Sequence, residues 1–349
     1  NMAYSTISKP SLHFNTKLTT GTGSSQAVTG LGFQPDWIWG KRRDSTGHHS
    51  LFDVVRGITK GLEANSAAGQ FTSSDYYSSF DSDGFTIAAG SGGAGNGSSQ
   101  TAAQWCWKAG NSAGSANSDG ATATTVSANQ TAGFSIVKHT GTGSATTLGH
   151  GLNAVPKMIF SKNLADSASW VVYHQGIGNT HYMSLNNDGG TSDNTMWNDT
   201  TPTSSVFSIG NHNNNNDSSD EIIHYVFAEK KGYSKFGTYK GNGDANGTFI
   251  YTGFKPAFIL LKDSTSVVSW TIYDDQRSSS GNNPTDKIFH PNNSNAENTA
   301  DDIDIVSNGF KCRTSVAGTN KNNATFIYMA FAAEPLVANV GASIPATAR

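Results

Sequence analysis

Short apolar runs that open with proline and close with lysine recur three times along the chain. Each run carries a large apolar residue two positions after the proline, isoleucine at the third, a second apolar residue at the fourth and lysine at the sixth. The runs are Pro35–Lys41, Pro156–Lys162 and Pro256–Lys262. The same alignment extends without a gap to a second set of apolar segments, which are His49–Asp53, Trp170–His174 and Trp270–Asp274. A repeat of this kind indicates that the chain is built from several copies of one structural unit.

Glycine turns and aromatic strands flank each run in the same order. The turns before the prolines are Gly21–Gly23, Gly141–Gly143 and Gly241–Gly243. Each copy closes with an aromatic segment, and these are Trp105–Trp107, Tyr225–Phe227 and Tyr328–Phe331. Because all these segments occur in the same order three times, we infer that the chain contains three copies of one module.

Each module is predicted to be β structure. The proline-led runs are short, rich in aromatics and isoleucine, and bounded by glycine and polar turns, which is typical of strands. Successive strand side chains point to opposite faces, and here both faces are apolar, so each run is expected to be a central strand covered on two sides. Leu51–Leu62 is the best helix candidate, although Gly57 and Gly61 interrupt it. We predict an all-β protein of three tandem homologous β-sandwich-like modules, with a jelly-roll or lectin-like arrangement as one option.

The spacing of the runs places the module boundaries near residues 130 and 231. The first interval is longer, and its extra length falls in 110–132, a stretch rich in Gly, Ala, Ser and Thr that is predicted to be a connector. The expected modules are therefore 1–130, which includes this connector, 131–231 and 232–349, which includes a C-terminal tail.

Composition narrows the function classes. Only 14% of the 349 residues are charged, and the net charge of −3 provides no electrostatic footprint for nucleic acid. Low charge also argues against a coiled coil, and no run of about 18 apolar residues indicates a membrane span. The two cysteines, Cys106 and Cys312, form no disulfide framework and match no metal spacing.

Catalytic patterns are weak. No Gly-x-Ser-x-Gly elbow joins a strand to a helix, and the few glutamates, Glu63, Glu221, Glu229, Glu297 and Glu334, lie outside apolar strand contexts that would suit acid catalysis. Asp53 and Asp274 share a module position with His174, and this variation suggests a surface or end-of-strand role. We therefore expect no enzyme.

The most regular polar feature is the lysine that closes each run. Lys41, Lys162 and Lys262 could form a three-fold set of anion or glycan ligands, but their regularity favours a structural role in which the stem packs on apolar surface. Arg42 and Arg43 add a basic cluster found only in the first module, a candidate contact for an acidic surface.

Asp81 and Asp83 before Gly84 are the weak candidates for a metal site, because alternate carboxylates suit calcium. No glutamate follows at the spacing of a calcium loop, and a tight turn before a strand is the favoured interpretation. No cofactor is expected, with calcium as the open alternative.

Aromatic residues among amides are the best candidates for ligand binding. Trp197, Asn198 and Asp199 lie in a polar segment of the second module, and Tyr76 and Tyr77 hold a comparable place in the first. An exposed ring can stack on a sugar while amides bind its hydroxyls. The remaining six tryptophans fall on repeated strands and are expected in the core.

Several longer motifs resemble a repeat found in tail-fibre-like virion proteins of marine bacteriophages. The resemblance covers nearly the whole chain and rests on residues 2–17, 31–39, 80–85, 105–110, 232–237, 251–256 and 344–349. It implies a virion location and a structural or adsorption role, and it assigns no catalytic or binding residue. Gly40, with Arg42 and Arg43, departs from the pattern, and we expect it to distort the end of that strand.

The sequence thus predicts a non-enzymatic virion protein: a tail fibre, an appendage or a decoration that attaches to a host surface through its loops. The expected partners are other virion proteins and a host cell-surface glycan, with neither nucleic acid nor a membrane span. A virion-associated polysaccharide hydrolase or lyase is the main alternative, and a cellular lectin-like adhesin is a weaker one. Three modules in one chain could mimic three-fold symmetry, and a homotrimer is equally open.

Overall fold

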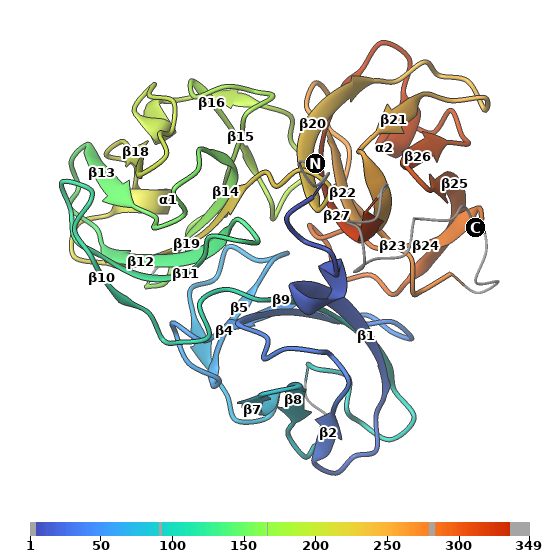
Figure 1. The fold of residues 1–349 in the computed structure, drawn as a ribbon, viewed down its shortest axis with the longest axis horizontal. Coiled ribbons are helices and arrows are strands. Elements are labelled where there is room, and N and C mark those ends of the chain that lie inside the picture. Colours follow the sequence, from blue (N-terminus) through green and yellow to red (C-terminus); the bar gives the residue numbers. More distant parts are fainter. Residues whose placement is uncertain (1–4, 91–92, 166, 279–282, 336–349) are drawn as a thin grey trace.

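Three lobes of β structure surround a common centre (Figure 1). The computed structural model describes residues 5–90, 93–165, 167–278 and 283–335. Each lobe is one copy of the repeat and contains an inner sheet, which faces the centre, and a smaller or equal outer sheet. Among the described residues the helices are no longer than four residues and the rest of the regular structure is strand, so the predicted all-β class is confirmed. All strand pairs within the sheets are antiparallel in this part of the chain.

Module 1 comprises β1–β9, after the short 3-10 helix Pro10–Leu12. Its inner sheet has the order β1 (Phe14–Thr20), β9 (Thr101–Trp107), β3 (Trp37–Arg42), β4 (Ser50–Asp53), β5 (Lys60–Glu63) and β6 (Phe71–Thr72). Its outer sheet has the order β2 (Gln26–Val28), β8 (Gly84–Ile87) and β7 (Tyr77–Asp81).

Module 2 repeats this plan and extends it. Its inner sheet has the order β10 (Ser115–Asn117), β11 (Thr124–Asn129), β12 (Phe134–Thr140), β19 (Glu221–Ala228), β14 (Pro156–Asn163), β15 (Val171–His174), β16 (His181–Ser184) and β17 (Ser192–Asp193). The outer pair is β13 (Thr146–Gly149) and β18 (Val206–Ile209), accompanied by the 3-10 helix Thr195–Trp197 and helix α1 (Asn213–Asn216).

Module 3 has two four-stranded sheets. The inner sheet has the order β20 (Ser234–Lys240), β27 (Thr325–Pro335), β22 (Phe254–Asp263) and β23 (Thr271–Asp274). The outer sheet has the order β21 (Phe249–Tyr251), β26 (Gly309–Cys312), β25 (Asn298–Val306) and β24 (Thr285–Ile288), and helix α2 (Ala317–Asn320) follows β26.

Two local expectations differ from the structure. The connector predicted at 110–132 contains β10 and β11, which pair with each other and, through β12, join the sheet of module 2. The first boundary therefore lies near residue 110, not near 130. The helix candidate Leu51–Leu62 instead forms the β4–β5 hairpin, since its two glycines interrupt the pattern and its apolar residues pair across strands.

Gly40 leaves its strand regular, so the expected distortion is wrong. It pairs with Ser50 on one side and Gln104 on the other within β3. A Cβ at this position would lie 2.6 Å from both the Gln104 Oε1 and the Tyr77 hydroxyl. The Tyr77 hydroxyl donates to that Gln104 oxygen across the two sheets of module 1, and glycine makes room for this buried hydrogen bond.

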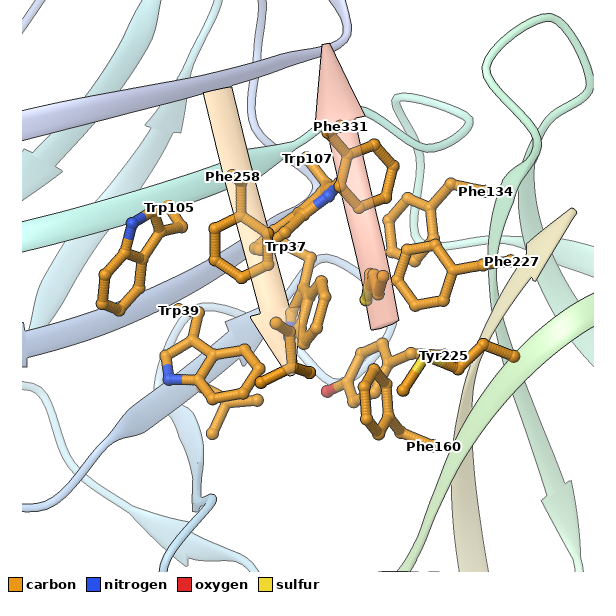
Figure 2. Close-up of a cluster of buried hydrophobic side chains, with 14 of the residues drawn as sticks. Trp37, Trp39, Trp105, Trp107, Phe134, Phe160, Tyr225, Phe227, Phe258 and Phe331 are labelled. Atoms are coloured by element: carbon orange, nitrogen blue, oxygen red, sulfur yellow. The ribbon is translucent and has the colours of Figure 1, made fainter. Parts of the chain in front are cut away.

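One hydrophobic core is shared by the inner sheets of all three modules (Figure 2). Trp37 of module 1 stacks on Tyr225 of module 2 with ring centroids 4.4 Å apart. Phe331 of module 3 contacts rings of all three modules, at 5.4 Å from Phe14 of module 1, 5.9 Å from Phe227 of module 2 and 6.4 Å from Phe258 of module 3. The apolar face of each inner sheet is therefore buried against the other two modules, which explains why both faces of the repeated strands are apolar.

Each module also has a core of its own between its inner and outer sheets. Ile38, Ile159 and Ile259, the isoleucines at the third position of the repeat, point into these separate cores. Trp37, Met158 and Phe258, one position earlier, point into the shared core. The alternation along one strand thus ties each sandwich to the common centre.

A buried asparagine fastens the glycine turn in every module. In module 2, Asn216 accepts a hydrogen bond from the Thr142 backbone N–H at 2.8 Å, and its Nδ2 donates to the carbonyls of Ser144 and Gly210. Asn96 and Asn320 make the corresponding three bonds in modules 1 and 3. The turn needs glycine because a Cβ on Gly141 would lie 1.8 Å from the Asp217 carbonyl oxygen.

Candidate functional site

Polar contacts gather at the three junctions between modules, here called seams. Each seam joins the segment after the repeated lysine of one module to a loop of the preceding module through two backbone hydrogen bonds. Between modules 1 and 2 the bonds are Gln70 N–H to Leu164 O at 2.8 Å and Ala168 N–H to Ala67 O at 2.9 Å. The equivalent bonds between modules 2 and 3 involve Thr191 with Ser264 and Val268 with Asp188.

The third seam closes the ring. Glu297 N–H of module 3 donates to Arg43 O of module 1 at 3.0 Å, and Gly47 N–H donates to Ser294 O at 2.8 Å. The same head-to-tail contact therefore occurs three times and returns to its starting point, as in a closed cyclic oligomer. One chain contains the entire ring, without a second copy to complete it.

Charged residues at the strand ends complete two of the seams. Asp53 ends β4 and forms a buried ion pair with Arg56, while its Oδ2 accepts a hydrogen bond from the Tyr225 hydroxyl of module 2 at 2.7 Å. Asp274 ends β23 in the same way: it pairs with Arg277, and its Oδ2 accepts from the Trp105 indole N–H of module 1 at 2.9 Å. All four charged side chains are at most 1% exposed.

His174 occupies the equivalent position in module 2. It donates a hydrogen bond across the seam, whereas Asp53 and Asp274 accept one. Its Nδ1 accepts from the Gly176 N–H, so the proton lies on Nε2, which donates to the Tyr328 carbonyl of module 3 at 3.2 Å. The strand register places Met329 where Trp105 and Tyr225 stand. Methionine cannot donate a hydrogen bond, so an aspartate here would have no side-chain donor across the seam. Histidine stands there instead and donates to a main-chain carbonyl.

The surface role expected for Asp53, His174 and Asp274 is therefore wrong. All three side chains are fully buried, although they do end their strands. The residue type at this position depends on its partner in the neighbouring module. Asp53 and Asp274 accept hydrogen bonds from Tyr225 and Trp105, whereas His174 donates to the main chain of the strand that carries Met329. The sequence alone did not reveal this relation.

The neutral state of His174 predicts acid sensitivity. Burial lowers the pKa of His174 to about 4, against 6.5 in an unfolded chain. The unfolded state then binds an extra proton between these values, so this contribution to stability is complete above pH 6.5 and is lost as the pH falls toward 4. We expect the difference in unfolding free energy between the wild type and His174→Asn to shrink by about 3 kcal/mol over this window. Denaturant unfolding at several pH values measures it.

Parallel pH curves for the two proteins would contradict this role of His174. The overall acid sensitivity has further sources, because burial also lowers the pKa of His139 to about 4 and that of His224 well below 6.5. Asp36 acts in the opposite sense: burial raises its pKa to about 6, so its ionisation costs stability as the pH rises. The comparison with His174→Asn cancels these common contributions.

The repeated lysines are part of the seams. The ammonium groups of Lys41, Lys162 and Lys262 each donate to the carbonyl of the next residue, at 2.8, 2.8 and 2.7 Å. Lys162 also reaches the Ala67 carbonyl of module 1 at 3.0 Å. Burial lowers the pKa of Lys41 and Lys262 to about 8. These contacts support the structural interpretation of the three lysines.

Arg42 and Arg43 do not form one basic cluster. Arg43 makes a two-pronged ion pair with Glu297 of module 3, with both N–O distances at 2.9 Å. Arg42 turns to its neighbour Asp44 in a partly exposed pair at 2.8 Å. Each arginine thus has an acidic partner in the chain, and Arg43 belongs to the third seam.

The exposed aromatic rings expected at Trp197 and Tyr77 are absent. Trp197 is 1% exposed and packs in the module 2 core, with its ring 5.7 Å from that of Tyr173. Tyr77 is fully buried, and Tyr76 is half-buried against Phe52 and Phe71. Stacking on a sugar requires an accessible face, so the prediction that these rings form a sugar platform is wrong for Trp197 and Tyr77.

Asn198 and Asp199 are exposed, and both have left-handed backbone conformations with φ of 49° and 45°. They form the turn that follows the 3-10 helix and allow the Trp197 side chain to enter the core. A ligand role for these two residues stays a prediction.

The Asp81–Asp83 segment is a β-hairpin turn. Asp83 Oδ1 and Oδ2 accept from the backbone N–H groups of Gly32 and Gly30 at 2.7 and 2.9 Å, and Asp81 accepts from the Thr86 hydroxyl. The Gly32 bond, followed by the Gly30 bond, lowers the pKa of Asp83. Within the described residues no three His, Cys, Asp or Glu side chains gather as metal ligands.

A serine–histidine pair lies inside module 2. Ser161 Oγ is 2.6 Å from His224 Nδ1, and His224 Nε2 is 3.0 Å from His139 Nδ1. Ser161 and His224 are fully buried between the two sheets, where Phe207 contacts the His224 ring. A substrate has no access to this serine, so the group is a buried hydrogen-bond network.

These features define a class of protein: an all-β chain in which three homologous sandwich modules close a ring through head-to-tail seams. The chain belongs to the family described as Domain of unknown function (DUF7483), which matches residues 9–335. The match spans all three modules of the chain. No curated protein and no solved structure matches the chain. No helix in the described part of the chain is long and apolar enough to cross a membrane.

Proposed function

We propose that the chain is a non-enzymatic bacteriophage virion protein, a tail fibre, appendage or decoration that attaches to a glycan on the host surface. Support for a virion protein comes from the motifs that resemble tail-fibre-like proteins. Several of them, such as 31–39 and 105–110, supply strands of the shared core. In these motifs the resemblance concerns residues that build the ring, whereas the motif 344–349 lies outside the described residues.

The proposal that the protein is not an enzyme rests on one observation: its buried acidic and basic side chains are engaged in contacts that hold the fold together. Asp53, Asp274 and their arginines hold the seams, and Ser161 with His224 is enclosed in module 2. These groups stabilise the fold from positions that a polysaccharide cannot reach. Rigid modules with uncharged Gly-, Ser- and Asn-rich loops are well suited to recognition, because loops vary while the scaffold stays fixed.

Two measurements test the proposal. Genes next to this one are expected to encode capsid and tail proteins, and a metabolic neighbourhood would argue against a virion protein. The whole protein, displayed at high valency on beads, is expected to bind host cells or a glycan array, since linked weak sites gain avidity. Failure to bind either would remove the attachment role and leave a structural one. Release of reducing sugar ends from surface polysaccharide would overturn the non-enzymatic assignment.

A further inference from the structure

The three seams differ at two equivalent positions that face each other. Three residues after each strand end, modules 1 and 3 carry Arg56 and Arg277, whereas module 2 carries Ile177. The loop residue that faces them differs as well: it is Gln70 in module 1, Glu297 in module 3 and Thr191 in module 2. Where the other two seams have two long polar side chains, the seam of module 2 has the shorter side chains of Ile177 and Thr191.

The arginines fill the other two seams. Arg56 donates to Asp53, to the Gln70 Oε1 at 3.4 Å and to the Tyr225 hydroxyl of module 2 at 3.2 Å. Arg277 pairs with Asp274 and Glu297, and its guanidinium lies 5.4 Å from the Trp105 ring of module 1. Each guanidinium therefore bridges the two modules that meet at its seam.

A groove of about 630 Å³ opens where module 2 lacks such an arginine. It lies between modules 2 and 3, and Gly176, Ile177, His181 and Thr191 form one wall while residues 264–267 and Thr325 form the other. The volume falls within the roughly 300–1,000 Å³ range of small-molecule sites. The shorter side chains of Ile177 and Thr191 leave this space to a ligand.

The lining chemistry is that of a site for a neutral, hydroxyl-rich ligand. The hydroxyls of Ser266 and Thr325 and the imidazole of His181 supply donors and acceptors, and Ile177 and Val267 supply apolar surface. The hydroxyls of Ser264 and Thr265 donate to the Thr325 carbonyl and to Asp263, so they offer the ligand acceptors only. The nearby cations are already engaged: Lys262 donates to the Asp263 and Ser266 carbonyls, and Lys321 donates to the Ser266 hydroxyl at 2.7 Å. A nucleic acid or sulfated chain would require free cations.

We propose that this groove, between modules 2 and 3, is the site that binds one neutral sugar unit of the host glycan. This inference rests on the proposed attachment function and places its recognition in one seam of the three. The sugar hydroxyls bond to the serine and threonine side chains and to loop backbone groups. The apolar face of the sugar lies against Ile177 and Val267.

The internal repeat provides the control for the test. The full chain, labelled with ¹⁵N, is titrated with glucose, galactose, mannose and N-acetylglucosamine in turn, and backbone amide signals are followed. We expect at least one sugar to shift the signals of residues 176–177, 190–191 and 264–267. The equivalent residues of the first seam, 55–56 and 69–70, should not move. Equal shifts in both seams, shifts elsewhere or no shift with any of the four sugars would overturn the proposal.

Two variants close the groove by different means. Ile177→Arg with Thr191→Gln copies the filled first seam and should weaken binding by about tenfold or more. Val267→Lys should weaken it as well without a risk to folding, since Val267 is 73% exposed, whereas Val316→Lys, at 53% exposure outside the groove, should not. Unchanged affinity in both groove variants would contradict the site.

Cell binding separates this inference from the function on which it rests. If the groove variants bind cells as well as the wild type does, the sugar site is wrong and the attachment role survives. If the wild type binds sugar in the groove but the bead-displayed protein binds no cells, the site survives and the attachment role fails.

Discussion

Replacing Phe331 with alanine is expected to lower the free energy of unfolding by about 3–5 kcal/mol, the range for a fully buried phenylalanine. Phe331 is 1% exposed and contacts rings from modules 1, 2 and 3 within the shared core. The loss removes packing from all three modules together. The transition should therefore remain single, because no inner sheet keeps its apolar face covered after another module unfolds.

Guanidinium unfolding followed by tryptophan fluorescence and by far-UV circular dichroism measures this effect. The two probes should give coincident transitions before and after the substitution. Phe249→Ala is the matched control in the same module, since Phe249 is 47% exposed, and it should change stability by about 0.5 kcal/mol or less. Separate transitions for the two probes would show that the modules unfold independently.

Replacing Arg277 with methionine is expected to cost about 3–5 kcal/mol, because it leaves the buried Asp274 carboxylate without its counter-charge. Arg277 is fully buried, and besides its acidic partners it donates to the Ile272 carbonyl and lies 4.6 Å from the Phe289 ring. Thermal and denaturant unfolding measure the loss. Arg42→Ala, which breaks a partly exposed pair, should cost about 1 kcal/mol or less.

A second substitution separates charge from packing at this site. Asp274→Asn combined with Arg277→Met loses one of the two oxygens that accept from the Trp105 indole and from the Gln276 and Arg277 N–H groups, but it removes the isolated buried charge, which is the larger cost. The double variant should therefore be more stable than Arg277→Met alone. If it is less stable, the hydrogen bonds that the Asp274 carboxylate accepts contribute more than the removal of its unpaired charge gains.

The repeat and its β character could be predicted from sequence because they depend on local patterns. The apolar runs ending at Lys41, Lys162 and Lys262 mark the central inner strands in all three modules. The patterns also indicated that both faces of these strands are covered. They could not show that the second cover is the other two modules, because an apolar face does not specify what packs on it.

The candidate site was harder to predict, for reasons that particular residues illustrate. Trp197 stands among polar residues, but a left-handed turn at Asn198 directs them outward and the ring inward. The seam bonds of Gln70, Thr191 and Glu297 use backbone N–H groups, which carry no side-chain signal. One signal was available, since an asparagine stands nine residues before Trp105, Tyr225 and Met329. These are the three asparagines that fasten the glycine turns.

Containment of the whole ring in one polypeptide has a consequence for how the ring can evolve. In a trimer of identical subunits, any substitution appears in all three seams at once, so a change that benefits one contact is imposed on the others. Here each seam is encoded separately. His174, which donates to the strand that carries Met329, and Ile177 are differences confined to a single seam. Two copies can maintain the architecture while the third changes.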